Sequence, residues 1–206
     1  MTTRRRMVRS FSDAPVPPVV LERILDSARE APSAGNSQGT SMVVLSGPQQ
    51  TAPFWAATTT PEWRTTSHRW PGLSRAPVVI VVLTSPALYA SRYDEPDKIT
   101  SGLGTFAGNE AESTWDQASW PVPYWFFDAG TTTMLLMLSA TDAGLGVGFL
   151  GNFRGEADLL TSLGVPATWR YAGAVLLGEP DGGDSPSKSL QRGRRPLTET
   201  VHRGRW

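Results

Sequence analysis

Residues 134–151 read MLLMLSATDAGLGVGFLG, and this stretch decides the fold class. It overlaps a helical pattern over residues 126–143, in which the run Met134–Leu138 is apolar on every side, and this run predicts a helix buried in the middle of a domain or a dimer. The helix is too short, and too interrupted by threonines and Asp142, to span a membrane. Gly144-Leu145-Gly146 ends it, because glycine readily adopts a positive φ, and a strand is predicted to start near Leu145.

The same stretch contains Gly146-Val147-Gly148-Phe149-Leu150-Gly151, which satisfies the G-x-G-x-x-G pattern of dinucleotide-binding folds. That pattern needs a strand before it, a helix directly after it and an acidic residue about 20 positions downstream. Here a long helix precedes the glycines, and residues 172–174 are Ala, Gly and Ala. We therefore interpret the motif as a helix end followed by a Gly-rich strand that lies close to something flat.

The remaining segments mix helices and strands without regular alternation. Apolar residues recur at helical spacing over residues 18–30, and residues 77–83 form a continuous β-branched run that favours a sheet covered on both faces. Further predicted elements are strands over residues 42–45 and 172–177 and a short helix over residues 156–163. The mixture favours an α+β sandwich formed by one domain over residues 1–206. Residues 86–126 lack periodicity and are predicted to be a lid or substrate-pocket insertion within it.

Composition excludes several kinds of chemistry. The chain has no cysteine, which excludes disulfides, thiolate nucleophiles and Cys-ligated zinc or iron–sulfur clusters. Its two histidines, His68 and His202, are too few for a multi-histidine metal site, and we interpret both as structural. Redox chemistry would therefore need an organic cofactor. The net charge of +0 argues against general nucleic-acid affinity, and the N-terminus lacks the apolar run of a secretory signal, which predicts the cytoplasm.

Arginines gather near both ends of the chain, within residues 5–9 and 192–195. A terminal charge run is usually a solvated arm, which an anionic macromolecule could bind. However, Val8 and Phe11 are apolar anchors that a disordered arm would not need, and the planar guanidinium suits phosphate. If the two ends meet, as termini often do, they would form a pocket for a phosphate monoester. The clusters comprise Arg5, Arg6, Arg9, Arg192, Arg194 and Arg195.

Several segments, in order, resemble motifs of the flavin-dependent nitroreductase family. Residues 5–11 look like the Arg-x-Ser-x-Arg/Lys-x-Phe opening of that family, and residues 31–38 are similar to its Pro-Ser-x-x-Asn-x-Gln loop. Asp128-Ala129-Gly130, the buried helix, Ala143-Gly144-Leu145-Gly146, Leu163-Gly164-Val165-Pro166 and the ending from Arg194 to Val201 follow in the family's order. Two departures stand out, because Met7 replaces the usual Ser and Gly39 stands where the family often has Pro.

The resemblance implies an α/β sandwich with a central mixed sheet flanked by helices, an intertwined homodimer and FMN as the cofactor. Residues 5–9 would hold the phosphate, ribityl chain and pyrimidine edge, and the 32–36 loop would reach the flavin of the other subunit. The Gly151 backbone would lie near N5, and Arg195, with Arg194 as the alternative, would close on the phosphate. The implied cofactor contacts are Arg5, Arg6, Met7, Arg9, Pro32, Ser33, Ala34, Asn36, Phe149, Leu150, Gly151, Arg194 and Arg195.

The implied activity is a ping-pong, NAD(P)H-driven hydride reduction of a nitroaromatic, a quinone or a similar flat, electron-poor substrate. It requires no catalytic side chain. Trp120, Tyr124 and Trp125 would wall the substrate, although core or dimer packing is the alternative for each. The same residues are compatible with a flavin-binding protein that does not turn over, and with enzymes of this fold that fragment flavin, dehalogenate or dehydrogenate.

Overall fold

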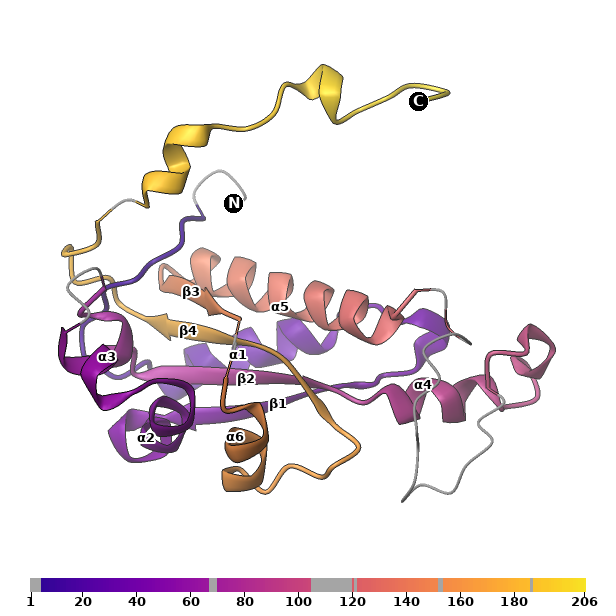
Figure 1. Ribbon diagram of the computed structural model, residues 1–206, viewed down its shortest axis with the longest axis horizontal. Helices are drawn as coiled ribbons and strands as arrows, with labels where there is room; N and C mark the ends of the chain where they lie inside the picture. The colour runs from indigo at the N-terminus through magenta and orange to yellow at the C-terminus, as the bar shows by residue number, and fades with distance from the viewer. Residues whose placement is uncertain (1–4, 67–69, 105–119, 121, 152–153, 186) are drawn as a thin grey trace.

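The computed structural model describes residues 5–66, 70–104, 120, 122–151, 154–185 and 187–206 (Figure 1). Its helices and strands follow the chain as α1 (Pro18–Arg29), β1 (Thr40–Ser46), α2 (Gly47–Thr58), α3 (Pro61–Thr66), β2 (Val78–Thr84), α4 (Pro86–Tyr93), α5 (Tyr124–Asp142), β3 (Gly146–Leu150), α6 (Glu156–Ser162) and β4 (Arg170–Gly178). No helix among these residues combines the length and the apolar character that crossing a bilayer needs.

Four strands form one sheet in the order β1-β2-β4-β3, and each neighbouring pair is antiparallel. The N-terminal segment adds a parallel bridge between Met7 and Val147 at the β3 edge. The predicted α+β sandwich is therefore confirmed. Among the described residues, the mixed character of the sheet comes from this bridge and not from the four named strands.

The central strand β2 shows why its sequence is apolar throughout. All seven of its residues are buried. Val78, Ile80 and Val82 belong to the hydrophobic cluster that includes α1 and α5, whereas Val79, Val81 and Leu83 belong to the cluster that includes α2 and α6. Because successive strand side chains point to opposite faces, a strand covered on both faces loses the usual alternation. The prediction from residues 77–83 is confirmed.

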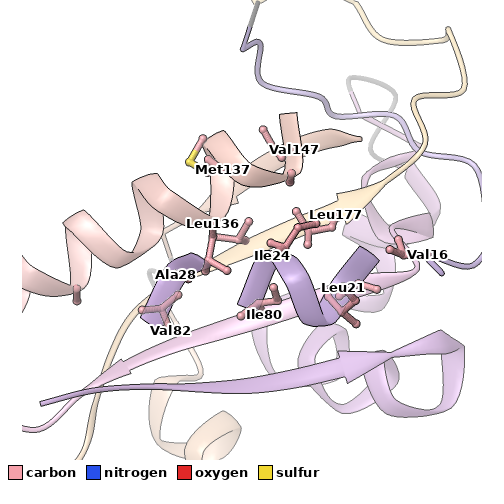
Figure 2. Close-up of a cluster of buried hydrophobic side chains, with 14 residues drawn as sticks. Val16, Leu21, Ile24, Ala28, Ile80, Val82, Leu136, Met137, Val147 and Leu177 are labelled. Atoms are coloured by element: carbon pink, nitrogen blue, oxygen red, sulfur yellow. The ribbon is translucent and has the colours of Figure 1, made fainter. Parts of the chain in front are cut away.

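Helices α1 and α5 together cover one face of the sheet. Leu21, Ile24 and Ala28 of α1 are buried at helical spacing, and proline occupies the first turn of the helix, where its missing N–H breaks no intrahelical bond. Figure 2 shows these side chains in one cluster with Leu136 and Met137 of α5. The helices predicted over residues 18–30 and 126–143 are confirmed.

Only one side of α5 is covered within the protomer. Leu136 and Met137 are at most 3% exposed, whereas Phe127 is 65% exposed and Met134 is 46% exposed. The helix has Gly144, at φ +83°, just beyond its end, as the sequence predicts. The fold of a single chain therefore explains the apolar residues on the buried side of α5 but not those on its exposed side.

The glycines at residues 146–151 lie in and just after an antiparallel strand, and not in a phosphate-binding turn. Gly146 pairs with Gly178 across β3 and β4. A Cβ at Gly148 would come 2.8 Å from the Val8 carbonyl oxygen. The glycine thus allows the backbone of the N-terminal segment to lie close against this strand, and this backbone is the flat neighbour that the Gly-rich pattern predicts. Rejecting the dinucleotide-binding interpretation was correct.

Three helices were not predicted from the sequence, namely α2, α3 and α4. Helix α2 begins directly after β1 with Pro48 in its first turn, and it contains a second proline, Pro53. Its Phe54 and Trp55 are buried in the hydrophobic cluster that includes α2 and α6, which we call the second core. Helix α4 occupies the start of residues 86–126, a region that lacks clear periodicity in the sequence. Residues 105–119 and 121 of that predicted insertion lie outside the described residues.

Candidate functional site

The N-terminal segment, residues 5–11, lies along the outer edge of β3. The Val8 amide donates to the Val147 carbonyl, with an N···O distance of 2.7 Å. Val8 packs against the second core, and Phe11 is fully buried in it. The apolar anchors predicted from the sequence are therefore confirmed, and the segment belongs to the sheet.

A polar cluster holds the end of this segment. Ser10 Oγ donates to Asp181 Oδ2 (2.9 Å), Arg75 pairs with the same carboxylate, and Arg75 Nε donates to the Phe11 carbonyl (3.0 Å). The Gly183 amide, the Ser10 hydroxyl and the Arg75 guanidinium hold the pKa of Asp181 below its ordinary value. The carboxylate is therefore ionised at neutral pH and fixes where the segment turns away from the sheet.

The three arginines of the segment differ in their surroundings. Arg6 is exposed, whereas Arg5 and Arg9 are partly buried. Arg5 Nη1 is buried and has no hydrogen-bond partner among the described residues. The Arg9 guanidinium lies over the Trp70 ring, 5.3 Å from its centroid, in a cation–π contact. A buried guanidinium N–H without an acceptor is unfavourable, so Arg5 marks a position suited to an anion.

The 33–39 loop is locked onto α5 by one buried carboxylate. Asp128 Oδ2 accepts from the Ala34 amide (2.7 Å) and from the Tyr89 hydroxyl (2.8 Å). Inside the loop, the Gln38 amide donates to Ser33 Oγ (2.9 Å). Gly35, Asn36 and Gln38 all have a positive φ, between +50° and +62°. For Asn36 and Gln38 this conformation is unfavourable, and the surrounding contacts hold it.

Helix α4 clamps the other side of this loop. Arg92 Nε donates to the Gly35 carbonyl (2.8 Å), and a Cβ at Gly35 would lie 2.8 Å from the Tyr93 ring. A Cβ at Gly39 would lie 2.3 Å from the Tyr89 ring. The aromatic ring of Tyr89 therefore explains why this chain has glycine at a position where the family often has proline.

Asp128 and Tyr89 were not assigned a role by the sequence analysis. Tyr89 is fully buried and Asp128 is 5% exposed. Burial, and then the hydrogen bond to Asp128, raise the pKa of Tyr89, so its hydroxyl stays protonated as a donor. The available signal was an acidic residue on the apolar helix α5, because a buried carboxylate requires hydrogen-bond partners.

The end of β3 presents open backbone. Phe149 is 38% exposed, Leu150 is partly buried and its carbonyl accepts from the Tyr171 hydroxyl (3.0 Å). Apart from its chain neighbours, no residue in the described part of the chain comes within 4 Å of an ideal Cβ at Gly151. The fold places Phe149 and Leu150 on the strand that the N-terminal segment borders, with Gly151 directly after it.

The C-terminal arm, residues 188–206, is exposed throughout. Figure 1 shows it running clear of the body on the α5 side. Arg195 pairs with Glu199 (Nε···O 3.3 Å), within the arm, and His202 stacks on Trp206 at 4.1 Å. No hydrogen bond or ion pair joins the arm to residues 5–11 in the described part of the chain. One protomer therefore does not form the two-ended arginine pocket, and the roles of Arg194 and Arg195 stay predictions.

The predicted substrate wall divides into buried and exposed members. Trp120 and Trp125 are each 3% exposed and pack against Tyr89, and Trp120 Nε1 donates to the Leu103 carbonyl (3.0 Å). Tyr124, at the start of α5, is 38% exposed. Within one protomer the two tryptophans thus pack behind the 33–39 loop, and Tyr124 is the member available to a ligand. His68 lies outside the described residues.

Known proteins share sequence motifs and the fold with this chain. The chain matches the model of the Nitroreductase family over residues 2–179. A nitroreductase family protein from Streptococcus pneumoniae has a TM-score of 0.68 at 23% identity, covering 98% of this chain and 96% of that one. One from Clostridium difficile has a TM-score of 0.67 at 19% identity, with coverage of 100% and 96%. Among curated proteins, none matches the chain in sequence.

A further neighbour bears on the site. A Desulfovibrio desulfuricans protein solved in complex with FMN has a TM-score of 0.60 at 23% identity, covering 97% of this chain and 92% of that one. The family match includes the N-terminal segment, the 33–39 loop and β3, and it ends before the C-terminal arm. The resemblance drawn from the sequence motifs is confirmed, and the chain belongs to the nitroreductase family.

Proposed function

We propose that the protein is an FMN-dependent oxidoreductase that uses NAD(P)H to reduce flat, electron-poor substrates such as nitroaromatics and quinones. The observation that carries the proposal is Arg5, whose Nη1 is buried without a partner among the described residues, on a segment that β3 and Asp181 hold in place. A phosphate there would supply the missing acceptor. The FMN bound by the Desulfovibrio relative supports FMN as the source of that phosphate.

Two parts of each protomer would hold its own FMN. Arg5, Arg6 and Arg9, with Met7 between them, would take the phosphate, ribityl chain and pyrimidine edge, and residues 149–151 would lie beside the ring system. Gly151 suits this role because, apart from its chain neighbours, no described residue has an atom within 4 Å of an ideal Cβ there. When bound, FMN supplies the two-electron chemistry, and nearby arginine charges favour its uptake of electrons.

The remaining side chains bind and orient, and no acid or base is assigned to the reaction. Asp128 is buried and its Oδ2 is engaged by Tyr89 and Ala34, which leaves it poorly placed to exchange a proton with a substrate. His202 is exposed in the arm. We therefore propose a reaction in which no side chain of the described residues acts as a catalytic acid or base.

The protomer also leaves an apolar surface that a second copy of the chain would cover. Phe127, Gly130 and Met134 share one face of α5, and all three are exposed. The arm carries exposed apolar side chains of its own, namely Leu190, Leu197, Val201 and Trp206. We infer a homodimer in which each arm packs on the other protomer and the 32–36 loop completes the partner's flavin site.

Two measurements test the redox proposal. The cofactor released from the purified protein by heat is identified by chromatography, and FMN is the expected result. FAD, or no flavin, contradicts it. Steady-state turnover with NADH or NADPH and a quinone then tests the activity. A protein that retains FMN but shows no turnover with either donor is a flavin-sequestering protein instead.

Sedimentation tests the dimer. Met134→Asp places a charge on the exposed side of α5 and should yield monomers. Val19→Asp is the matched control, because Val19 is 77% exposed and lies on α1, outside the α5 face proposed as the interface. The interface assignment fails if both variants, or neither, dissociate.

A further inference from the structure

A cavity of about 570 Å³ lies beside the end of β3. Its walls come from α2, from the turn that leads into α3, and from the segments around Trp70 and Gly151. This volume is in the range of sites for one small organic molecule. None of the described residues that line it is acidic.

Three indole rings make the cavity suited to a flat ligand. Trp55 and Trp63 stack nearly parallel, with ring centroids 6.5 Å apart and an interplanar angle of 14°, and Trp70 lines the same space. Trp55 is 5% exposed, and its Nε1 is buried without a hydrogen-bond partner among the described residues. Such a wall favours an aromatic ring over an aliphatic chain of the same size, because ring faces and edges interact favourably.

The cavity borders the proposed cofactor site at two points. Trp70 carries the Arg9 guanidinium over its ring, and Arg9 is one of the arginines assigned to FMN. Leu150 and Gly151, assigned to the ring system near N5, line the cavity from the other end. A ligand held there would thus lie next to the flavin and share Leu150 and Gly151 with it, while the tryptophans and Arg154 are not among the FMN contacts named above.

One cation stands in the wall of this cavity. Arg154 is exposed and forms no ion pair with a carboxylate in the part of the chain that the structure describes. Glu156, two residues further on, is paired with Arg170 at 3.6 Å. Arg154 is therefore available to an anionic group of the ligand, for which the guanidinium offers two parallel donors.

We propose that this cavity is a subsite for a planar aromatic carboxylate, whose ring lies against the indoles and whose carboxylate binds Arg154. The inference rests on the proposed function for its second part, that such an acid, when it also carries a nitro or quinone group to receive the electrons, is the class of electron acceptor the enzyme takes. Binding itself depends only on the residues of the cavity.

The test is a titration of the protein, as purified, with 4-methylbenzoate, followed by tryptophan fluorescence. 4-Methylbenzylamine and 4-methylbenzyl alcohol serve as cationic and neutral probes of the same shape. We expect the benzoate to bind tightest. Arg154→Gln should weaken the benzoate by roughly tenfold and leave the alcohol unchanged, because only the charge-assisted contact is lost. Arg29→Gln, an exposed arginine on α1, is the matched control.

Trp63→Ala should weaken both the benzoate and the alcohol, and Trp63→Phe should restore part of the loss. Flavin content is measured in parallel and should be unchanged in every variant. Equal affinity for the three probes, or no effect of Arg154→Gln, overturns the proposal. Loss of flavin in Trp63→Ala also overturns it, because the cavity would then hold the cofactor. Benzoate binding by a protein that contains no flavin would keep the subsite and reject the proposed function.

Discussion

The 33–39 loop and the C-terminal arm both carry residues assigned to FMN. The protomer holds the loop in place by several contacts, whereas it leaves the arm exposed. The loop is held by a buried carboxylate, by Arg92 and by Thr84, whose hydroxyl donates to the Gly39 carbonyl (3.1 Å). The arm is exposed from residue 188 to residue 206, and its hydrogen bonds and ion pairs are local.

The difference shows two ways in which a segment can contribute to a binding site: it is held in place by its own protomer, or it becomes ordered on another surface. A loop with two non-glycine residues, Asn36 and Gln38, at positive φ must be held by its own protomer before a ligand arrives, since unfavourable backbone conformations persist only when neighbours impose them. An arm with exposed apolar side chains can become ordered against another surface, and α5 offers one.

Deleting residues 188–206 should convert the dimer into monomers and abolish stable FMN binding. The protomer should keep its fold, because the arm contributes nothing to either hydrophobic cluster. Sedimentation, flavin absorbance and far-ultraviolet circular dichroism measure the three quantities. A truncated dimer that still holds FMN would place the interface elsewhere.

Arg5→Ala and Arg195→Ala should each reduce FMN affinity while the fold persists. A charge-assisted hydrogen bond contributes about 1.5–3 kcal/mol, which corresponds to a loss of roughly tenfold to a hundredfold. Titration of the flavin-free protein with FMN measures the effect, with Arg203→Ala as a control in the same arm. If Arg5→Ala lowers FMN affinity and Arg195→Ala does not, Arg195 does not reach the phosphate.

Asp128→Ala should lower the free energy of unfolding by about 1–3 kcal/mol, because the Tyr89 hydroxyl and the Ala34 amide lose their common acceptor. Asp128→Asn retains an oxygen that can accept both bonds and should be milder. Urea denaturation measures stability, and FMN titration should show a parallel loss as the loop loosens. Thr141→Ala, on the same helix, should do little to FMN affinity.

Gly39→Ala should cost about 1–3 kcal/mol of stability, because its Cβ would meet the Tyr89 ring at 2.3 Å and the ring is fully buried. Gly151→Ala is the informative counterpart. Its Cβ would meet no described residue within 4 Å other than its chain neighbours, so stability should hold while FMN affinity falls. Thermal denaturation of both variants without flavin decides the point, and equal destabilisation would argue against open space beside Gly151.

The smallest effect concerns acid pH. Both guanidinium Nη atoms of Arg92 lie 2.7 Å from Asp97 oxygens, and this contact lowers the pKa of Asp97 from 3.8 to about 2. A depressed carboxyl pKa adds stability that is present above the unfolded value and is lost as the pH falls through the folded one. The Arg92 contact should therefore weaken between about pH 4 and 2. Carboxyl NMR titration measures it, and Arg92→Gln should return the midpoint toward 3.8.

Local pattern was sufficient where one face or one run of residues decides a structure. Helical spacing located α1, the unbroken apolar run located β2, and the glycines after Asp142 located the end of α5. The pattern failed for α2 and α4. Pro53 lies inside α2 and the helix has little amphipathic character, while α4 has only eight residues, so neither provides a clear period.

Sequence pattern alone located the four strands, helices α1, α5 and α6, the lack of cysteine chemistry and the motifs that place the chain in its family, because these depend on residues close together along the chain. Only the tertiary structure showed that Asp128 holds Ala34 from 94 positions away, that Tyr89 requires glycine at position 39, and that three tryptophans and Arg154 surround one cavity. Such contacts join segments that no local period connects. They exist only once the sheet and its two helical layers bring those segments together.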